Sequence, residues 1–98
     1  MKKQSTWREE RIHIGESVLY EHRFADTEPN YLVVTNGSGA NVYVCLSPAV
    51  SAVTFDVIIP PFGRRMLARE LPFQKVYFYT EAPAGASLHL TSFIAEFN

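Results

Sequence analysis

The sequence predicts an all-β protein that folds as a single antiparallel β-sandwich, or jelly-roll-like barrel, of about eight short strands. Three observations support this fold class. Short apolar runs alternate with turn residues from Tyr31 almost to the C-terminus. The turns are rich in Pro, Gly, Asn and Ser, which end strands and reverse the chain. A length of 98 residues with 47% hydrophobic residues suits one domain, spanning residues 1–98, with its own core.

The N-terminal segment, residues 1–25, is richer in charge than the rest of the chain and contains two alternating runs. In the run 18–25 apolar and polar residues alternate, which predicts a strand with one solvated face. The run 7–14 has charged residues on both of its faces. One face would carry Trp7, Glu9, Arg11 and His13, and the other Arg8, Glu10, Ile12 and Ile14. Residues 1–14 are therefore interpreted as either a charged edge strand or an arm that packs on a neighbouring subunit.

The middle of the chain predicts a hairpin and then a longer strand. The dipeptide Asn36–Gly37 lies between the runs YLVVT and NVYVCLSP, and it predicts a tight β-hairpin because both residue types tolerate positive φ. Residues 53–59 alternate cleanly, so a strand is expected there. Pro60–Pro61 ends this strand, since proline cannot donate to a ladder of hydrogen bonds.

The C-terminal third predicts three further strands. The segment RRMLAREL, residues 64–71, contains good helix formers, but it is short and flanked by prolines, so we interpret it as a strand. Residues 75–81 alternate and predict another strand. The final run, SLHLTSFIAEF, changes parity after its second leucine. We expect a bulge near Thr91–Ser92; the alternative is a strand that is covered on both faces.

Net charge, hydropathy and cysteine content indicate which partners and which cellular compartment to expect. The net charge of −1 argues against nucleic acid, because phosphate contacts normally require a basic excess. No segment approaches the roughly 18 consecutive apolar residues of a membrane span, and the basic start MKKQ is not followed by the apolar core of a secretory signal. The single cysteine, Cys45, is expected to be a buried, reduced thiol, which suits a reducing compartment.

The sequence shows no recognisable catalytic, cofactor-binding or metal-ligating constellation, so we expect no enzyme activity and no cofactor. The three histidines, His13, His22 and His89, are scattered over three expected strands and offer no close pair of the kind that zinc sites use. A metal site of the cupin type would need a His-x-His pair, which the sequence lacks. Residues 26–30 are rich in oxygen ligands, but their spacing fits no established calcium loop.

Two groups of surface residues predict contacts with a partner. The densest basic cluster consists of Arg64, Arg65 and Arg69. Guanidinium groups pair well with carboxylates on another molecule, and the alternative is a solvated hairpin face. The tyrosines expected on outward faces are Tyr31, Tyr43, Tyr77 and Tyr79. Such rings stack on sugars or pack against another subunit, and an aromatic content of 13% is more than one small core needs.

The stretches YLVVTNGSGANVYVCLS, FDVIIPPFGRRM and LPFQKVYFYTEAPAGASLHLTSF resemble the small β-sandwich structural proteins of tailed bacteriophages and prophages. The resemblance spans residues 31–95 and consists of the order of strands and turns. It implies a virion component, such as a head decoration, head-fibre, tail or baseplate subunit. It also implies a homo-oligomer that contacts other virion proteins and resides in the virion, or in the bacterial cytoplasm before assembly.

We therefore expect a non-enzymatic structural subunit that acts through symmetric self-association. The residues expected at its interfaces are Trp7, Arg8, Arg11, Arg64, Arg65, Arg69, Tyr77 and Tyr79. The alternative is a small carbohydrate-binding module that holds a glycan on tyrosines exposed on a sheet face.

Overall fold

The structure, a computed structural model, describes residues 7–24, 29–69 and 73–94. Within these residues the chain forms eight β-strands, as the alternating sequence pattern predicts. The strands are β1 (Trp7–Ile14), β2 (Tyr20–Arg23), β3 (Tyr31–Asn36), β4 (Val42–Cys45), β5 (Val57–Ile59), β6 (Arg64–Ala68), β7 (Lys75–Thr80) and β8 (Ala86–Phe93). Val, Ile, Tyr and Phe are frequent in most of them, and these residue types pack well on a pleated, half-buried surface.

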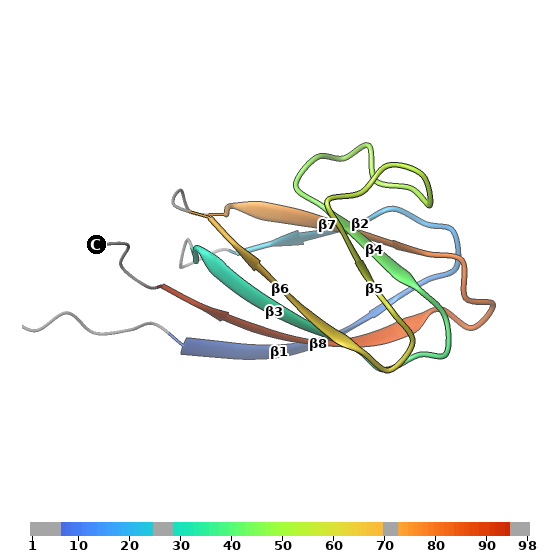
Figure 1. Cartoon of the computed structure of the whole chain (residues 1–98), viewed down its shortest axis with the longest axis horizontal. Helices are drawn as coiled ribbons and strands as arrows, with labels where there is room; N and C mark the ends of the chain where they lie inside the picture. The colour runs from blue at the N-terminus through green and yellow to red at the C-terminus, as the bar shows by residue number, and fades with distance from the viewer. Residues whose placement is uncertain (1–6, 25–28, 70–72, 95–98) are drawn as a thin grey trace, which may run out of the picture.

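The strands form two four-stranded antiparallel sheets that face each other as a sandwich (Figure 1). Sheet A has the order β1-β8-β3-β6, and sheet B has the order β2-β7-β4-β5. The first strand pairs with the last, the second with the seventh, the third with the sixth and the fourth with the fifth. This nested pairing is the jelly-roll arrangement of two Greek keys, so the predicted fold class is confirmed.

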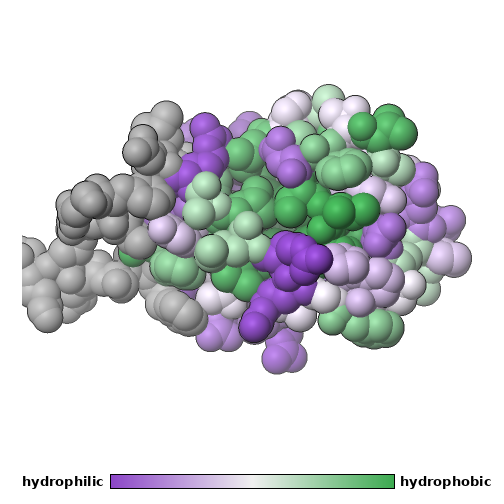
Figure 2. Space-filling view, in the orientation of Figure 1, coloured by the Kyte–Doolittle hydropathy of each residue, from purple (hydrophilic) through white to green (hydrophobic). Residues whose placement is uncertain are grey.

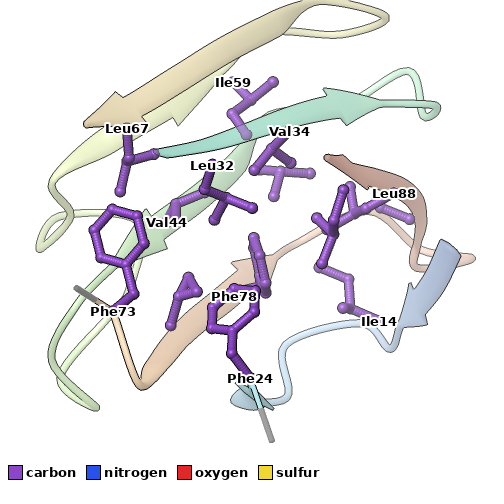
Figure 3. Close-up of a cluster of buried hydrophobic side chains, with 14 residues drawn as sticks. Ile14, Phe24, Leu32, Val34, Val44, Ile59, Leu67, Phe73, Phe78 and Leu88 are labelled. Atoms are coloured by element: carbon purple, nitrogen blue, oxygen red, sulfur yellow. The ribbon is translucent and has the colours of Figure 1, made fainter. Parts of the chain in front are cut away.

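The core lies between the sheets and is made of side chains that point inward at every second position. Sheet A contributes Leu32 and Leu88, and sheet B contributes Val44 and Phe78, all at most 2% exposed (Figure 3). Phe73, just before β7, closes one end of this cluster and is also 2% exposed. Full burial of a side chain of this kind contributes about 1.5–3 kcal/mol to stability. The inward side chains therefore stabilise the sandwich.

The chain crosses from sheet A to sheet B after Asn36, and the predicted hairpin at this point is wrong. β3 and β4 lie in different sheets and do not pair. Neither Asn36 nor Gly37 has a positive φ. Instead the buried Asn36 side chain accepts a hydrogen bond from the Ser38 amide at 2.9 Å and donates one to the Ala40 carbonyl at 2.7 Å. Asparagine is used here for side-chain hydrogen bonds that shape a corner, which is its other common role in turns.

The strand expected over 53–59 is shorter than predicted, because only Val57–Ile59 forms β5. The preceding residues belong to a connection, residues 46–56, that folds over the outer face of sheet B (Figure 1). Its two ends are tied together, since the Leu46 amide donates to Asp56 Oδ2 at 2.8 Å. Val53, near the middle of the connection, is 88% exposed. Alternation alone cannot separate such a connection from a strand.

β8 keeps one register along its whole length, so the predicted bulge at Thr91–Ser92 is wrong. It pairs residue by residue with β1 and β3 as far as Phe93. Ser92 faces the core and is 2% exposed, whereas the Phe93 ring stacks on Tyr31 on the outer face of sheet A. The change of parity in the sequence thus reflects an aromatic pair outside the core. Residues 95–97 of the same run lie outside the described residues.

Two further predictions about strands are confirmed. The segment Arg64–Ala68 is strand β6, at one edge of sheet A. β1 is the opposite edge strand, as the charged run 7–14 suggested, while residues 1–6 lie outside the described residues. Of the oxygen-rich segment 26–30, residues 26–28 also lie outside them. The described part of the chain has no helix with the length and hydropathy of a membrane span.

Candidate functional site

The outer face of sheet B is covered by the protein's own chain. The connection 46–56 packs Val50 against Cys45 and Tyr77, and these three side chains are 7%, 5% and 8% exposed. Cys45 is a free thiol inside this small cluster, as the sequence predicts. A second, minor apolar cluster therefore lies outside the main core and holds the connection on the sheet.

The tyrosines of sheet B do not form an open platform. Their outward direction is confirmed, but the connection closes off Tyr77, so the prediction that Tyr77 is a surface contact is wrong. Tyr43 is half-buried, and its ring centroid lies 5.3 Å from that of Phe55 in the connection. Tyr79 lies 6.3 Å from Tyr43, measured between ring centroids, and its hydroxyl donates to Glu81 Oε2 at 3.5 Å.

The outer face of sheet A brings together four polar residues from four strands. Arg11 on β1 pairs with His89 on β8, His89 pairs with Thr35 on β3, and Thr35 pairs with Arg64 on β6. We call these four residues the outer row. The arginines at its two ends are exposed, and the two residues between them are half-buried. The sheet register thus places two guanidinium groups on either side of an imidazole and a hydroxyl.

A shallow pocket of about 520 Å³ lies over one end of this face. Its lining includes three members of the outer row together with His13, Gly37 and Ser87. His13 Nδ1 lies 3.1 Å from Ser87 Oγ, and His89 Nε2 lies 3.1 Å from Glu9 Oε1. The pocket therefore offers both hydrogen-bond donors and acceptors within a small area.

An aromatic pair lies on the same face, farther along the strands. Tyr31 and Phe93 are directly opposite each other on β3 and β8. Their ring centroids are 5.0 Å apart and the ring planes are 15° from parallel. Tyr31 and Thr35 are four residues apart on β3, which corresponds to about 13 Å along a strand. The outer face of sheet A thus has a polar region and an aromatic region within reach of one extended ligand.

A second exposed surface lies where β5 and β6, edge strands of the two sheets, run close together at one side of the sandwich. We call it the β5–β6 side. Figure 2 looks onto this side and shows hydrophobic residues gathered over its centre, with strongly hydrophilic residues crossing and flanking them. The exposed large hydrophobic side chains of residues 53–66 are Val53 (88%) and Phe55 (40%) in the connection, Phe62 (73%) between β5 and β6, and Met66 (54%), which pairs with Val33 and has outward parity on sheet A. Arg65 and Arg69 are exposed on β6 and just after it.

The structure distributes the residues predicted at interfaces over separate surfaces. Arg11 and Arg64 belong to the outer row, whereas Arg65 and Arg69 belong to the β5–β6 side. Arg64 and Arg65 have opposite parity on β6, as a strand requires. The remaining members are placed as follows: Trp7 begins β1 opposite Phe93, half-buried Arg8 lies opposite Ser92, and Tyr77 and Tyr79 lie on the outer face of sheet B.

Sequence reasoning did not select His89 or Thr35 as site residues. Both residues alternate with apolar neighbours that face the core, and this alternation was the signal that could have placed them on an outer face. Their neighbours across the sheet could not be known without the register of four strands that are distant along the chain. His22, by contrast, is inside the sandwich, where its Nε2 lies 3.0 Å from Glu10 Oε1.

Neither a metal cluster nor a known relative identifies the site. In the described ranges, no group of three or more His, Cys, Asp and Glu side chains is placed to hold a metal ion. Comparisons with models of protein families, with curated proteins and with solved structures found no match.

Proposed function

We propose that this protein is a non-enzymatic structural subunit of a phage or prophage particle, such as a head decoration, head-fibre, tail or baseplate component, that associates symmetrically with copies of itself. One observation carries the proposal. Of the large hydrophobic side chains that are exposed in the described residues, all but Val18 and Leu19 lie in the segment 53–66. Exposed apolar side chains concentrated in one stretch of a small domain favour an interaction surface there.

Burial of the β5–β6 side between copies would drive the association. A large apolar side chain contributes about 1.5–3 kcal/mol when it is fully removed from water. Arg65 and Arg69 border the apolar side chains, and guanidinium groups in that position pair with carboxylates and fix the orientation of a partner. β5 and β6 are also edge strands, so their unpaired backbone groups can extend a sheet into a neighbouring subunit.

The jelly-roll fold agrees with this proposal without identifying it. Viral capsid proteins use this fold, but so do lectins and cupins. The resemblance of residues 31–95 to phage sandwich proteins favours the first of these classes. The charged edge strand β1 discourages unspecific pairing at one border of sheet A, which leaves β6 as the other edge of this sheet.

The alternative of a carbohydrate-binding module built on the tyrosines of sheet B is weaker. Tyr77 is 8% exposed beneath the connection 46–56, and Tyr43 is half-buried beside Phe55. A sugar ring needs an accessible aromatic face for stacking. These rings are used for packing within the chain.

The proposal is tested by asking whether the protein is part of a particle. Particles released from cells that carry the gene are purified on a density gradient and probed with an antibody against the purified chain. We expect the protein in the particle band, and we expect Met66→Glu to be lost from that band while Val18→Glu, which alters an exposed hydrophobic residue in the β1–β2 turn, is retained. Recovery of the wild-type protein only in the soluble fraction, with particles present, overturns the proposal.

A further inference from the structure

We propose that the outer row on sheet A, with the pocket beside it, binds an acidic saccharide, a sugar chain that carries carboxylate or sulfate groups. The inference does not rest on the proposed function, because the pocket and three members of the outer row, Arg11, His89 and Thr35, lie on β1, β8 and β3. Only Arg64 neighbours the β5–β6 side, since it shares the outward face of β6 with Met66.

The two arginines of the outer row carry positive charge that is not paired within the described residues. Within residues 7–24, 29–69 and 73–94, neither Arg11 nor Arg64 forms an ion pair, and both are exposed. They lie on the two edge strands, three strand spacings apart, which is about 14 Å between backbones. A ligand across the outer row meets a guanidinium group at each end, and it also meets the Glu9 carboxylate, whose Oε1 lies 3.1 Å from His89 Nε2. Guanidinium binds carboxylate or sulfate oxygens through two parallel hydrogen bonds.

Side chains that form hydrogen bonds lie between the two arginines. His89 and Thr35 lie there, and His13 and Ser87 follow in the pocket. Imidazole and hydroxyl groups both donate and accept hydrogen bonds, as sugar hydroxyls do. The pocket volume of about 520 Å³ falls within the usual range of small-ligand sites, about 300–1,000 Å³. The exposed surface of the pocket is mostly apolar, so it suits a ligand that, like a sugar ring, combines hydroxyl groups with apolar faces.

An aromatic pair, Tyr31 and Phe93, lies on the same face of sheet A. The rings of Tyr31 and Phe93 are stacked 5.0 Å apart, and the backbone of Tyr31 lies about 13 Å from that of Thr35 along β3. Both aromatic side chains are half-buried, so a sugar packs only against the ring surface that their mutual stacking leaves exposed. Together with the outer row they accommodate several linked sugars, so we infer an oligosaccharide rather than a single anion.

Other anionic polymers fit this face less well. Nucleic acid gains most of its affinity from many phosphate contacts, which a chain of net charge −1 with two suitable arginines does not supply. Extended peptides usually bind by adding a strand at a sheet edge, whereas the outer row lies across the face of the sheet. An acidic saccharide uses all three features of the face at once.

The test is a titration of the isotope-labelled protein, followed by NMR spectroscopy of its backbone amides. The probes are oligogalacturonate, a heparin oligosaccharide, a neutral galacto-oligosaccharide of matched length, an oligoglutamate peptide and inorganic phosphate. We expect at least one acidic saccharide to shift the amides of His89, Thr35 and Ser87, and the neutral sugar to bind at least ten-fold more weakly. No shift with either acidic saccharide overturns the proposal. It is also overturned if the peptide or phosphate binds the face as tightly as the saccharides, or if the shifts lie on sheet B.

Variants identify the side chains that are responsible. Arg11→Gln should weaken binding of the acidic saccharide about ten-fold or more, because a hydrogen bond to a charged group is lost. The matched control is Arg23→Gln, which removes an exposed arginine from strand β2 of the other sheet. Both substitutions are at exposed positions, so the thermal midpoint should stay near that of the wild type. Equal loss of binding in the two variants, or no loss in Arg11→Gln, contradicts the proposed site.

Discussion

The side chain of Asn36 donates a hydrogen bond to the carbonyl oxygen of Ile59 at 3.1 Å and thereby links sheet A to sheet B. The same Nδ2 atom lies 3.0 Å from the Pro60 carbonyl oxygen. The backbone N–H of Asn36 donates a further hydrogen bond to the Gly63 carbonyl oxygen at 2.8 Å. With an exposure of 1%, Asn36 is almost completely buried. The β3–β4 corner and the β5–β6 turn are thus joined at one residue.

Replacement of Asn36 by alanine should lower the free energy of unfolding by about 2–3 kcal/mol, because buried carbonyl groups lose their donor. Chemical denaturation with urea measures the effect. Asn41→Ala, an exposed position in the same corner, is the matched control and should change stability by less than about 0.5 kcal/mol. Equal stability of the two variants would contradict the role of Asn36 as the link between the sheets.

Gly85, in the β7–β8 turn, has a φ of +75°, and a Cβ at this position would overlap with the carbonyl oxygen of Ile14 at the end of β1. Gly85→Ala should therefore cost at least about 1–3 kcal/mol from backbone strain, with the steric overlap added to it. Gly15→Ala is the control, since its nearest heavy atom outside neighbouring residues would be 3.9 Å away. A thermal melt that shows both variants equally stable would argue against the close packing of this turn on β1.

The connection 46–56 should control the reactivity of the Cys45 thiol. Val50 covers Cys45 in the minor apolar cluster, so Val50→Ala should speed labelling of the thiol by a maleimide reagent several-fold under native conditions. Val53→Ala, in the same connection but at an 88% exposed position, should leave the labelling rate unchanged. If wild-type Cys45 reacts as fast as it does in denaturant, the connection does not cover the thiol.

The His22–Glu10 pair should contribute more to stability than the His89–Glu9 pair. Both histidine nitrogens lie close to a carboxylate oxygen, at 3.0 Å and 3.1 Å, but the His22 side chain is 10% exposed and that of His89 is 36% exposed. His22→Gln should cost about 1–3 kcal/mol, because the partner carboxylate is partly buried and loses its contact. His89→Gln should stay within about 0.5 kcal/mol of the wild type, because solvent screens an exposed pair. A larger loss for His89→Gln in urea denaturation would contradict this order.

The sequence was sufficient for the local elements of the fold. Alternation over residues 75–81 identified β7 with the correct inward face, and the charges of residues 7–14 indicated an edge strand, with an arm on a neighbouring subunit as the alternative. Alternation is a local signal, because neighbouring residues in a strand point to opposite faces. It failed at 53–56, where the alternating residues cover sheet B without forming a ladder.

The pairing of strands could not be predicted from the same signal. In a jelly roll β1 pairs with β8, and these strands lie at opposite ends of the chain. The Asn36–Gly37 dipeptide suggested a local hairpin, whereas the strands on its two sides belong to different sheets. The outer row depends on this long-range register, so the sequence indicated that Arg11 and Arg64 were exposed but not that they share one row.

The mass of the purified protein in solution, measured by light scattering after size-exclusion chromatography, tests self-association most directly. The account predicts a single defined oligomer that dissociates when Met66, 54% exposed on β6, is replaced by glutamate. Val18→Glu should leave the oligomer intact, because Val18 lies in the β1–β2 turn, outside the β5–β6 side. A monomer at every concentration tested, for the wild type as for Met66→Glu, would contradict the central claim.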